Sequence, residues 1–243
     1  GTIHQAANLD WYNLPLRTQL ANHYDLAVHI VNDNQAVLLA EFIFGQYKNS
    51  TDLVVIRVGH GIGAGIMVNG QLLYHQGAGE IGHVVVADEG ERCTCGNIGC
   101  LETVASNRAI VKKARTLAQQ HPTSRLNQLA TTPEKITIDT VIQAFHEGDP
   151  TLVSLVTDIG QYLGVAIAHL VSVLGAPPIL LCGRVARFGQ PLLDVIEYEV
   201  CKRSLTGRLH KPKIDVVSLK PNISDIVMLG AAASLLTNEL GLF

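Results

Sequence analysis

Three of the five cysteines in the chain lie within eight residues, in the segment RCTCGNIGC at 92–100. Together with His83, the residues Cys93, Cys95 and Cys100 form the pattern H-x9-C-x-C-x4-C. Three thiolates and one imidazole complete the tetrahedral shell of a structural zinc ion and leave no open position for catalysis. The glycines of the segment allow the tight turns that bring the thiolates onto one ion. The spacing therefore predicts a zinc site that orders this loop.

Other roles for these thiols are possible from the residues alone. Unliganded thiols are one alternative, and a redox pair of Cys93 and Cys95, with His83 as an ordinary loop residue, is another. Cys182 and Cys201 lie in apolar or helical patterns, which are typical of buried structural thiols. Cysteines crowded in this way suit a reducing compartment better than a disulfide framework.

Length and composition favour an α/β fold. The 243 residues allow one large or two small domains, and 47% apolar residues with only 5% aromatic residues indicate a core of aliphatic side chains. The formal charge of −3, without a run of like charge, provides no surface for nucleic acid, so any DNA binding would need another segment. No stretch reaches the ~18 uninterrupted apolar residues of a membrane span. We expect a soluble, cytoplasmic protein with no membrane insertion.

The elements that position the polar residues can be read from periodicity. The apolar run LAVHIV at 26–31 predicts a buried strand, and Asn32, Asp33 and Asn34 after it are good starters for a helix. Ligands of open α/β sheets bind at this edge, where a strand ends and a helix begins. Further strands are predicted at 52–59, 62–69, 71–75, 178–182 and 213–218, and Asn69-Gly70 predicts a hairpin turn between the second and third of them. Helices are predicted at 15–24, 103–119, 137–147, 150–174, 190–202 and 225–240, with a loop at 120–135.

Several segments resemble the signature of the ROK family, which comprises bacterial sugar repressors and sugar kinases. They are QGAGEIGHVVV at 76–86, RCTCGNIGCLETVAS at 92–106, VNDNQAVLLAE at 31–41, GHGIGAGIMVNGQLLY at 59–74 and LGAAASLL at 229–236. The resemblance implies an actin-like (ribonuclease H-like) fold of two α/β lobes with a zinc-stabilised loop and with a sugar in the cleft between the lobes. Residues 1–35 and 225–243 would form part of the small lobe, and residues 36–224 the large lobe with the zinc site and the cleft.

The same resemblance implies that parts of the family pattern lie outside this sequence. The opening strands of the fold, with a phosphate loop of the type D-x-G-G-T, do not occur in it and are expected just before Gly1. A DNA-binding helix-turn-helix domain, where a family member has one, would precede those strands.

By resemblance, five residues hold the hydroxyls of the sugar: Asn32, Asp33, Glu80, His83 and Glu102. Their types agree with this role, because carboxylates accept hydrogen bonds from hydroxyls and an amide both donates and accepts. His83 would use one ring nitrogen for the metal and the other for the ligand, and zinc would thereby aim His83 and Glu102 at the cleft. Each residue also has an ordinary alternative role: Asn32 as a helix cap, Glu80 as a solvated loop residue and Glu102 as an exposed carboxylate at a helix start.

The resemblance leaves a kinase and a sensor to be distinguished. In a kinase, Asp33 would be the catalytic base. Backbone glycines would bind ATP with magnesium, here Gly59, Gly61, Gly63 and Gly183. Two departures weaken the nucleotide prediction and leave the sugar prediction intact. His60 replaces a threonine of the phosphate loop, and Arg184 replaces the second glycine of a pair that admits adenosine, although its side chain could also swing into solvent.

We therefore expect a transcriptional regulator rather than an enzyme: the sugar-sensing effector and oligomerisation domain of a ROK repressor. Its expected partners are a sugar or sugar phosphate, DNA through the absent helix-turn-helix domain, and further copies in a homodimer or tetramer. Small residues at Gly160 and Gly164 suit close helix packing, either between copies or within one lobe. The alternatives are an ATP-dependent, glucokinase-like sugar kinase and a zinc-stabilised module that docks a transport protein.

Overall fold

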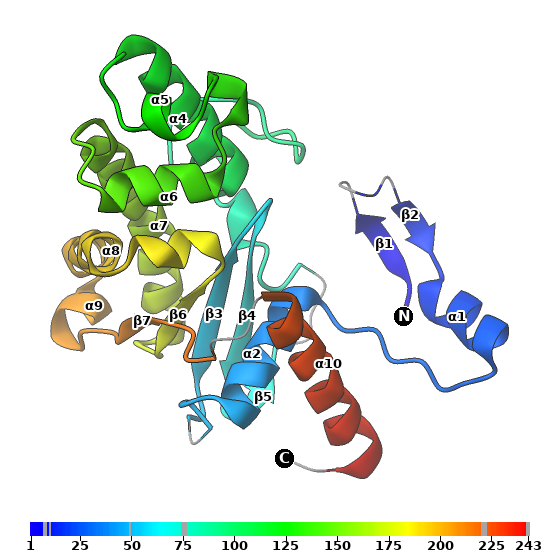
Figure 1. Ribbon diagram of the computed structural model, residues 1–243. Helices are drawn as coiled ribbons and strands as arrows, with labels where there is room; N and C mark the ends of the chain where they lie inside the picture. The colour runs from blue at the N-terminus through cyan, green and yellow to red at the C-terminus, as the bar shows by residue number, and fades with distance from the viewer. Residues whose placement is uncertain (7–8, 10, 49, 74–76, 220–222, 242–243) are drawn as a thin grey trace.

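A mixed five-stranded sheet in the order β5-β4-β3-β6-β7 forms the centre of the protein (Figure 1). The computed structural model describes residues 1–6, 9, 11–48, 50–73, 77–219 and 223–241. β3 pairs antiparallel with β4 and parallel with β6, and β6 pairs parallel with β7. The strands are β3 (Leu53–Val58), β4 (Ile62–Val68), β5 (Gln71–Leu72), β6 (Ile179–Cys182) and β7 (Ile214–Val216).

The sheet is covered on both faces, which is why β3 and β6 are almost continuous apolar runs. One face of β3, with Val54, Ile56 and Val58, belongs to the larger core. The other face carries Leu53 and Val55 and packs with the helices α2 and α10. These two helices span Asp33–Phe44 and Ile223–Leu240.

The larger core is closed by the helices between β5 and β7. Close packing of α7 on α8 uses the small residues Gly160 and Gly164, because an added Cβ would meet Val195 at 2.7 Å and Glu199 at 2.5 Å. The two glycines thus serve packing within this chain. The helices are α3 (Leu101–Ala105), α4 (Asn107–Gln120), α5 (Leu126–Leu129), α6 (Ile138–His146), α7 (Thr151–Leu174), α8 (Gln190–Arg203) and α9 (Leu205–Leu209), and the 3-10 turns are η1 (Ile81–His83), η2 (Pro133–Lys135) and η3 (Arg184–Phe188).

Helix α7 is long and apolar enough to cross a membrane by length and composition alone. More than half of its most apolar window, 56%, is buried inside the protein. Its buried side chains pack with α8 and α3, so α7 has the packing of a core helix.

The N-terminal part forms a separate small unit in Figure 1. An antiparallel hairpin of β1 (Ile3–Ala6) and β2 (Trp11–Leu14), which the sequence did not predict, leads into α1 (Leu16–Tyr24). The predicted strand at 26–31 is wrong. These residues run as extended chain with no ladder, because no strand among the described residues lies beside them, and Leu26 is 68% exposed.

The remaining predicted elements are confirmed with adjusted boundaries. The helix predicted at 103–119 is two helices, broken at Ser106, whose hydroxyl accepts a hydrogen bond from Ala109 N at the start of α4. The prediction of a loop over all of 120–135 is wrong in part, because this segment contains α5 and η2. The strand predicted at 71–75 ends at Leu72 as β5, and residues 74–76 lie outside the described part of the chain. Asn69 and Gly70, with φ of 51° and 74°, form the predicted hairpin turn.

Helix α10 lies directly against α2, which begins at the predicted ligand edge. The approach is so close that a Cβ on Gly230 would lie 1.7 Å from Ala36 O. The proposed lobe boundary at residue 35 falls within the first turn of α2. The division into lobes at 1–35 with 225–243 and at 36–224 stays a prediction.

Candidate functional site

The structure brings the predicted metal ligands His83, Cys93, Cys95 and Cys100 into one cluster. All four donor atoms lie within 4.8 Å of one another. His83 Nδ1 is 3.4 Å from Cys93 Sγ, and Cys95 Sγ is 3.5 Å from Cys100 Sγ. A tetrahedral ion with ligand bonds of about 2.3 Å places neighbouring sulfurs about 3.8 Å apart. The four donor atoms therefore fit around one metal ion once the longest distance between two of them shortens by about 1 Å.

Backbone contacts hold the metal loop, residues 77–100, in shape. Isolated bridges pair Val85 with Cys100 and Arg92 with Ile98. Gly99 has φ of 76°, and a Cβ there would lie 1.7 Å from Ala87 O, so only glycine permits this crossing of the chain. The loop thus places its cysteines by short-range turns and bridges.

Two of the three thiols, Cys95 and Cys100, differ in their proton affinity. Burial, supported by the neighbouring thiols, raises the pKa of Cys100 to about 12, whereas a backbone hydrogen bond at Asn97 lowers the pKa of the exposed Cys95. Metal binding requires thiolates, so a bound cation must displace the proton of Cys100. A divalent cation supplies the charge that makes this possible.

Glu102 connects the metal loop to the central sheet. It lies in the first turn of α3, two residues after Cys100, and its Oε2 accepts a hydrogen bond of 3.0 Å from Ile62 N at the start of β4. A Cβ on Gly61 would lie 2.5 Å from the same oxygen. Glu102 is therefore held against the β3–β4 turn and is more than a solvated carboxylate at a helix start.

His83 and Glu80 lie on the same side of the loop. The Nδ1 atom of His83 faces Cys93, while its Nε2 atom is 3.9 Å from Glu80 Oε2. The two ring nitrogens thus face different partners, which agrees with the predicted division between metal and ligand. The Glu80 side chain is 61% exposed and is therefore accessible to a ligand.

The other predicted sugar residues begin α2. Asn32 caps the helix, since its Oδ1 accepts hydrogen bonds from Asn34 N at 2.8 Å and Gln35 N at 3.4 Å. The capping alternative is thus confirmed for its amide oxygen. Asp33 forms an ion pair with Arg57 of β3, whose Nε donates to Asn34 Oδ1 at 3.1 Å.

Arg57 is the residue of this site that the sequence reasoning missed. It is a basic residue in the otherwise apolar strand LVVIRV, and that exception was the available signal. A charge in such a strand needs a partner, and the sequence does not show which acidic residue folds next to it.

Strand β4 supports both groups of site residues. The metal loop packs on it through Gly79 and Gly82, where an added Cβ would lie 2.0 Å from Ala64 O and 2.3 Å from Ile62 O. On the side of α2, a Cβ on Gly63 would lie 2.3 Å from Asn34 Nδ2. Glu102 and the start of α2 therefore converge on the N-terminal half of β4.

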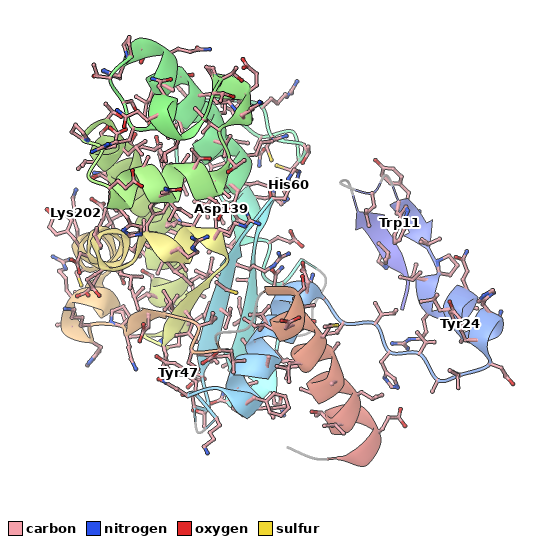
Figure 2. All side chains as sticks on the ribbon, viewed as in Figure 1. Trp11, Tyr24, Tyr47, His60, Asp139 and Lys202 are labelled. Carbon is pink, nitrogen blue, oxygen red and sulfur yellow. The ribbon has the colours of Figure 1, made fainter. Side chains whose placement is uncertain are left out.

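The four glycines predicted for a nucleotide lie at the ends of β3, β4 and β6. Gly59 N donates to Gly61 O at 2.9 Å across the turn that carries the exposed His60 (Figure 2). Gly183 has φ of 102°, and a Cβ on it would lie 2.1 Å from Val58 O. The turn at Gly183 thus has a structural need for glycine that is independent of any nucleotide.

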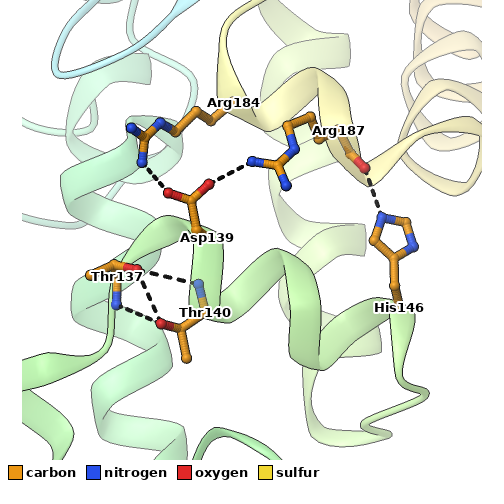
Figure 3. Close-up of polar contacts among 6 residues, drawn as sticks. All are labelled: Thr137, Asp139, Thr140, His146, Arg184 and Arg187. Carbon is orange, nitrogen blue, oxygen red and sulfur yellow. Dashed lines mark hydrogen bonds and ion pairs between the residues drawn. The ribbon is translucent and has the colours of Figure 1, made fainter. Parts of the chain in front are cut away.

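Arg184 does not extend freely into solvent. It forms an ion pair with Asp139 of α6, and Arg187 Nη1 lies 2.5 Å from the other carboxylate oxygen (Figure 3). Asp139 therefore holds two arginines of η3 against the start of α6. Arg184 is thus paired, and 56% of its side chain remains exposed.

Comparison with known proteins shows the class of this chain. The model of the ROK family matches residues 1–238, and the chain belongs to that family. The xylose repressor of Caldicellulosiruptor bescii is 32% identical over 99% of this chain and 60% of its own length. The transcriptional regulator NagC of Escherichia coli is 33% identical over 81% of this chain and 48% of its own length. A glucokinase of Halalkalibacterium halodurans is 36% identical over 81% of this chain and 61% of its own length.

Solved structures agree in fold. A ROK transcriptional regulator, described as a homologue of Escherichia coli MLC, superposes with a TM-score of 0.83 at 30% identity, over 96% of this chain and 59% of that chain. A ROK glucokinase from Streptomyces griseus, in complex with glucose and AMPPNP, has a TM-score of 0.84 at 28% identity, over 97% of this chain and 76% of that chain. The chain thus has the actin-like α/β fold of its family and spans 60% or less of the repressors it matches.

Proposed function

We propose that this chain is the sugar-sensing effector and oligomerisation part of a ROK transcriptional repressor that acts in the cytoplasm. The observation that carries the proposal is an asymmetry between two subsites. The residues expected to hold a sugar converge on β4, whereas the expected nucleotide side carries the exposed His60 and an Arg184 paired with Asp139. The similarity to a relative named as a xylose repressor and to one named as a DNA-binding transcriptional regulator supports the same function.

The ligand is a sugar or a sugar phosphate. Asp33, Glu80 and Glu102 accept hydrogen bonds from its hydroxyls, Asn32 donates through its amide, and His83 contributes Nε2. Zinc in the cluster of His83 with Cys93, Cys95 and Cys100 orders the loop from which Glu80 and Glu102 extend. The zinc is structural, because the protein supplies all four ligands.

The ligand regulates DNA binding by shifting a conformational equilibrium. DNA is bound by a helix-turn-helix domain outside this chain, and the repressor acts as a homodimer or tetramer. A sugar that binds one arrangement of the lobes about 100-fold more tightly than the other shifts the equilibrium by about 2.7 kcal/mol. A sugar with equal affinity for both arrangements changes nothing.

The test uses the full-length protein that contains this chain. Operator affinity is measured by fluorescence anisotropy with D-xylose, D-glucose, N-acetyl-D-glucosamine and their phosphates. We expect at least one of these ligands to change operator affinity about 10-fold or more, and Asp33→Asn to abolish the response while operator affinity without sugar stays unchanged. If none of them changes operator affinity, while a transport protein releases the operator, the docking-module alternative replaces the proposal.

A sugar kinase is the second candidate, and the similarity to glucokinases supports it. In that case Asp33 is the base, and ATP with magnesium binds at Gly59, Gly61, Gly63 and Gly183. Release of ADP that depends on both sugar and ATP in the full-length protein would establish the kinase. Its absence in the wild type, together with a sugar response at the operator, would exclude it.

A further inference from the structure

The position of Arg57 in β3 needs an explanation. Its strand neighbours Val54, Val55, Ile56 and Val58 are fully buried. Arg57 lies on the face of Leu53 and Val55 that packs with α2, and its side chain is 27% exposed. A guanidinium in such a place is stable only when it is paired and hydrogen-bonded. Its partners therefore indicate its role.

Both partners of Arg57 belong to the first turn of α2. Its Nη2 pairs with Asp33 Oδ2, and its Nε donates to Asn34 Oδ1 at 3.1 Å. Its Nη1 lies close to the β3–β4 turn, since a Cβ on Gly59 would be 3.3 Å from it. The planar, rigid guanidinium thus fixes two adjacent side chains at once and spans from the helix to the turn.

This pair is not needed to begin the helix. Asn32 already caps α2 with two hydrogen bonds from the backbone, and the acidic Asp33 in the first turn favours the helix dipole without any partner. The Asp33 side chain is also 45% exposed, so it is not a buried charge that would require neutralisation. What Arg57 adds is a single orientation for a carboxylate that would otherwise sample several rotamers.

We propose that Arg57 is a positioning residue for ligand binding: it holds Asp33 by Oδ2 so that Oδ1 accepts a hydrogen bond from a hydroxyl of the sugar. This role rests on the proposed function, because it needs a sugar at the start of α2. Asp33 then binds with its orientation already set, and the entropy cost of ordering it is removed from ligand binding. A merely structural pair between β3 and α2 would influence stability and leave ligand affinity unchanged.

The test is a double-mutant cycle in the full-length protein. Isothermal titration measures the affinity for D-xylose, D-glucose and N-acetyl-D-glucosamine, and the probe is the one that the wild type binds most tightly. The variants are Arg57→Met, Asp33→Asn and their combination. We expect each single variant to lose about 10-fold or more in affinity and the combination to lose no more than Asp33→Asn alone.

Two further variants separate positioning from folding. Arg57→Lys keeps the positive charge but loses the planar set of guanidinium donors. We expect its sugar affinity to lie between those of Arg57→Met and the wild type. Arg125→Met is the matched control, because the Arg125 side chain lies on the surface, donates to Gln128 Oε1 and is not part of the candidate site. It should bind the sugar like the wild type. If Arg57→Met unfolds below the assay temperature, Arg57→Gln, which keeps size and a donor, takes its place in the cycle.

The possible outcomes distinguish the positioning role of Arg57 from the proposed function of the chain. Sugar affinity of Arg57→Met within about 2-fold of the wild type, or additive losses in the combined variant, would overturn the positioning role and leave the proposed function intact. If the wild type binds none of the three sugars by calorimetry and shows no sugar response at the operator, the proposed function fails, and the positioning role fails with it.

Discussion

The metal loop and the first turn of α2 both face β4, but they are held in place in different ways. In the metal loop, all four candidate ligands lie between His83 and Cys100, and short-range turns bring them together. In α2, Asp33 is held by Arg57, which is 24 residues away in sequence. We expect the first region to depend on a bound ion and the second to depend on the packing of a helix against a sheet.

The surroundings of the two regions explain this difference. The metal loop has little core of its own, with Val85 49% and Ile98 50% exposed. Helix α2 is anchored by Ala36, Val37 and Leu38, all of which are fully buried. We therefore expect removal of the ion to damage the loop and to leave α2 in place.

The largest expected effect comes from loss of the metal. Structural zinc can supply on the order of 10 kcal/mol to a small loop, so Cys100→Ser should release the metal, lower the melting temperature by roughly 20 °C or more and abolish sugar binding. Metal content by mass spectrometry and calorimetric unfolding measure both effects. Cys201→Ser, which changes a free cysteine outside the cluster, is the control. A purified wild type that contains no metal and that a chelator does not destabilise would contradict this expectation.

The second effect tests whether α2 is held by packing alone. Glu41 of α2 is fully buried, and its carboxylate accepts hydrogen bonds from Ser218 Oγ at 2.5 Å, Ser218 N at 3.0 Å and Leu219 N at 3.3 Å. Glu41→Ala leaves these donors unpaired and should lower the free energy of unfolding by roughly 3 kcal/mol. Urea unfolding measures the loss. The exposed Glu147, which accepts from Gln143, is the matched control, and an equal effect of Glu147→Ala would show that burial is not the cause.

A third effect is the pH dependence of stability that comes from Asp149, a buried carboxylate outside both regions. Burial acts to raise the pKa of Asp149, but hydrogen bonds from Ser124, Thr151 and the Arg125 backbone outweigh it and leave the pKa below the ordinary value of 3.8. The ionised form is therefore stabilised by folding. This contribution is present above pH 3.8 and is lost as the pH falls through the lower pKa of the folded state.

The variant Asp149→Asn measures that contribution. It should lower the free energy of unfolding by about 1–3 kcal/mol at pH 7, because an amide cannot satisfy all of the donors. The difference from the wild type should shrink as the pH falls below 3.8, and urea unfolding between pH 2.5 and 7 records it. A difference that stays constant over this range would mean that the charge of Asp149 has no part in the effect.

The smallest effect is expected at Asp139. Its ion pairs with Arg184 and Arg187 are exposed, with 45% of the Asp139 side chain accessible. Exposed pairs contribute about 0–1 kcal/mol, so Asp139→Asn should change the melting temperature by no more than about 3 °C. Thermal unfolding at low and high salt measures the change. A loss of several kcal/mol would show that the fold of η3 depends strongly on this pair.

The predictions that the structure confirms were based on local sequence patterns. The clustering of His83 with three cysteines, the apolar strands β3, β4 and β6, and the turn at Asn69 and Gly70 all depend on residues within about 20 positions of one another. At such separations, turns and periodicity determine which groups can meet. The resemblance to the ROK family added the fold and the residues expected to bind a sugar, which spacing alone did not reveal.

Failures arose where distant segments decide the outcome. The apolar run at 26–31 has the composition of a strand, but a strand exists only where a neighbour accepts its hydrogen bonds. The break at Ser106 is an exception, since it depends on a local cap that competes with continuation of the helix. The partners of the charged groups were equally hidden, because ion pairs join residues that only the folded chain brings together.

The sequence by itself therefore determined the cluster of His83 with three cysteines, the apolar strands of the central sheet and the family. The tertiary structure alone decided that Arg57 holds Asp33, that Glu102 accepts from Ile62 and that Asp139 holds Arg184. The physical reason is the range of the interactions. A metal-binding cluster and a strand depend on residues close together in sequence. Charged groups instead find partners 24 to 45 residues away, and they do so only when a sheet and its helices have packed.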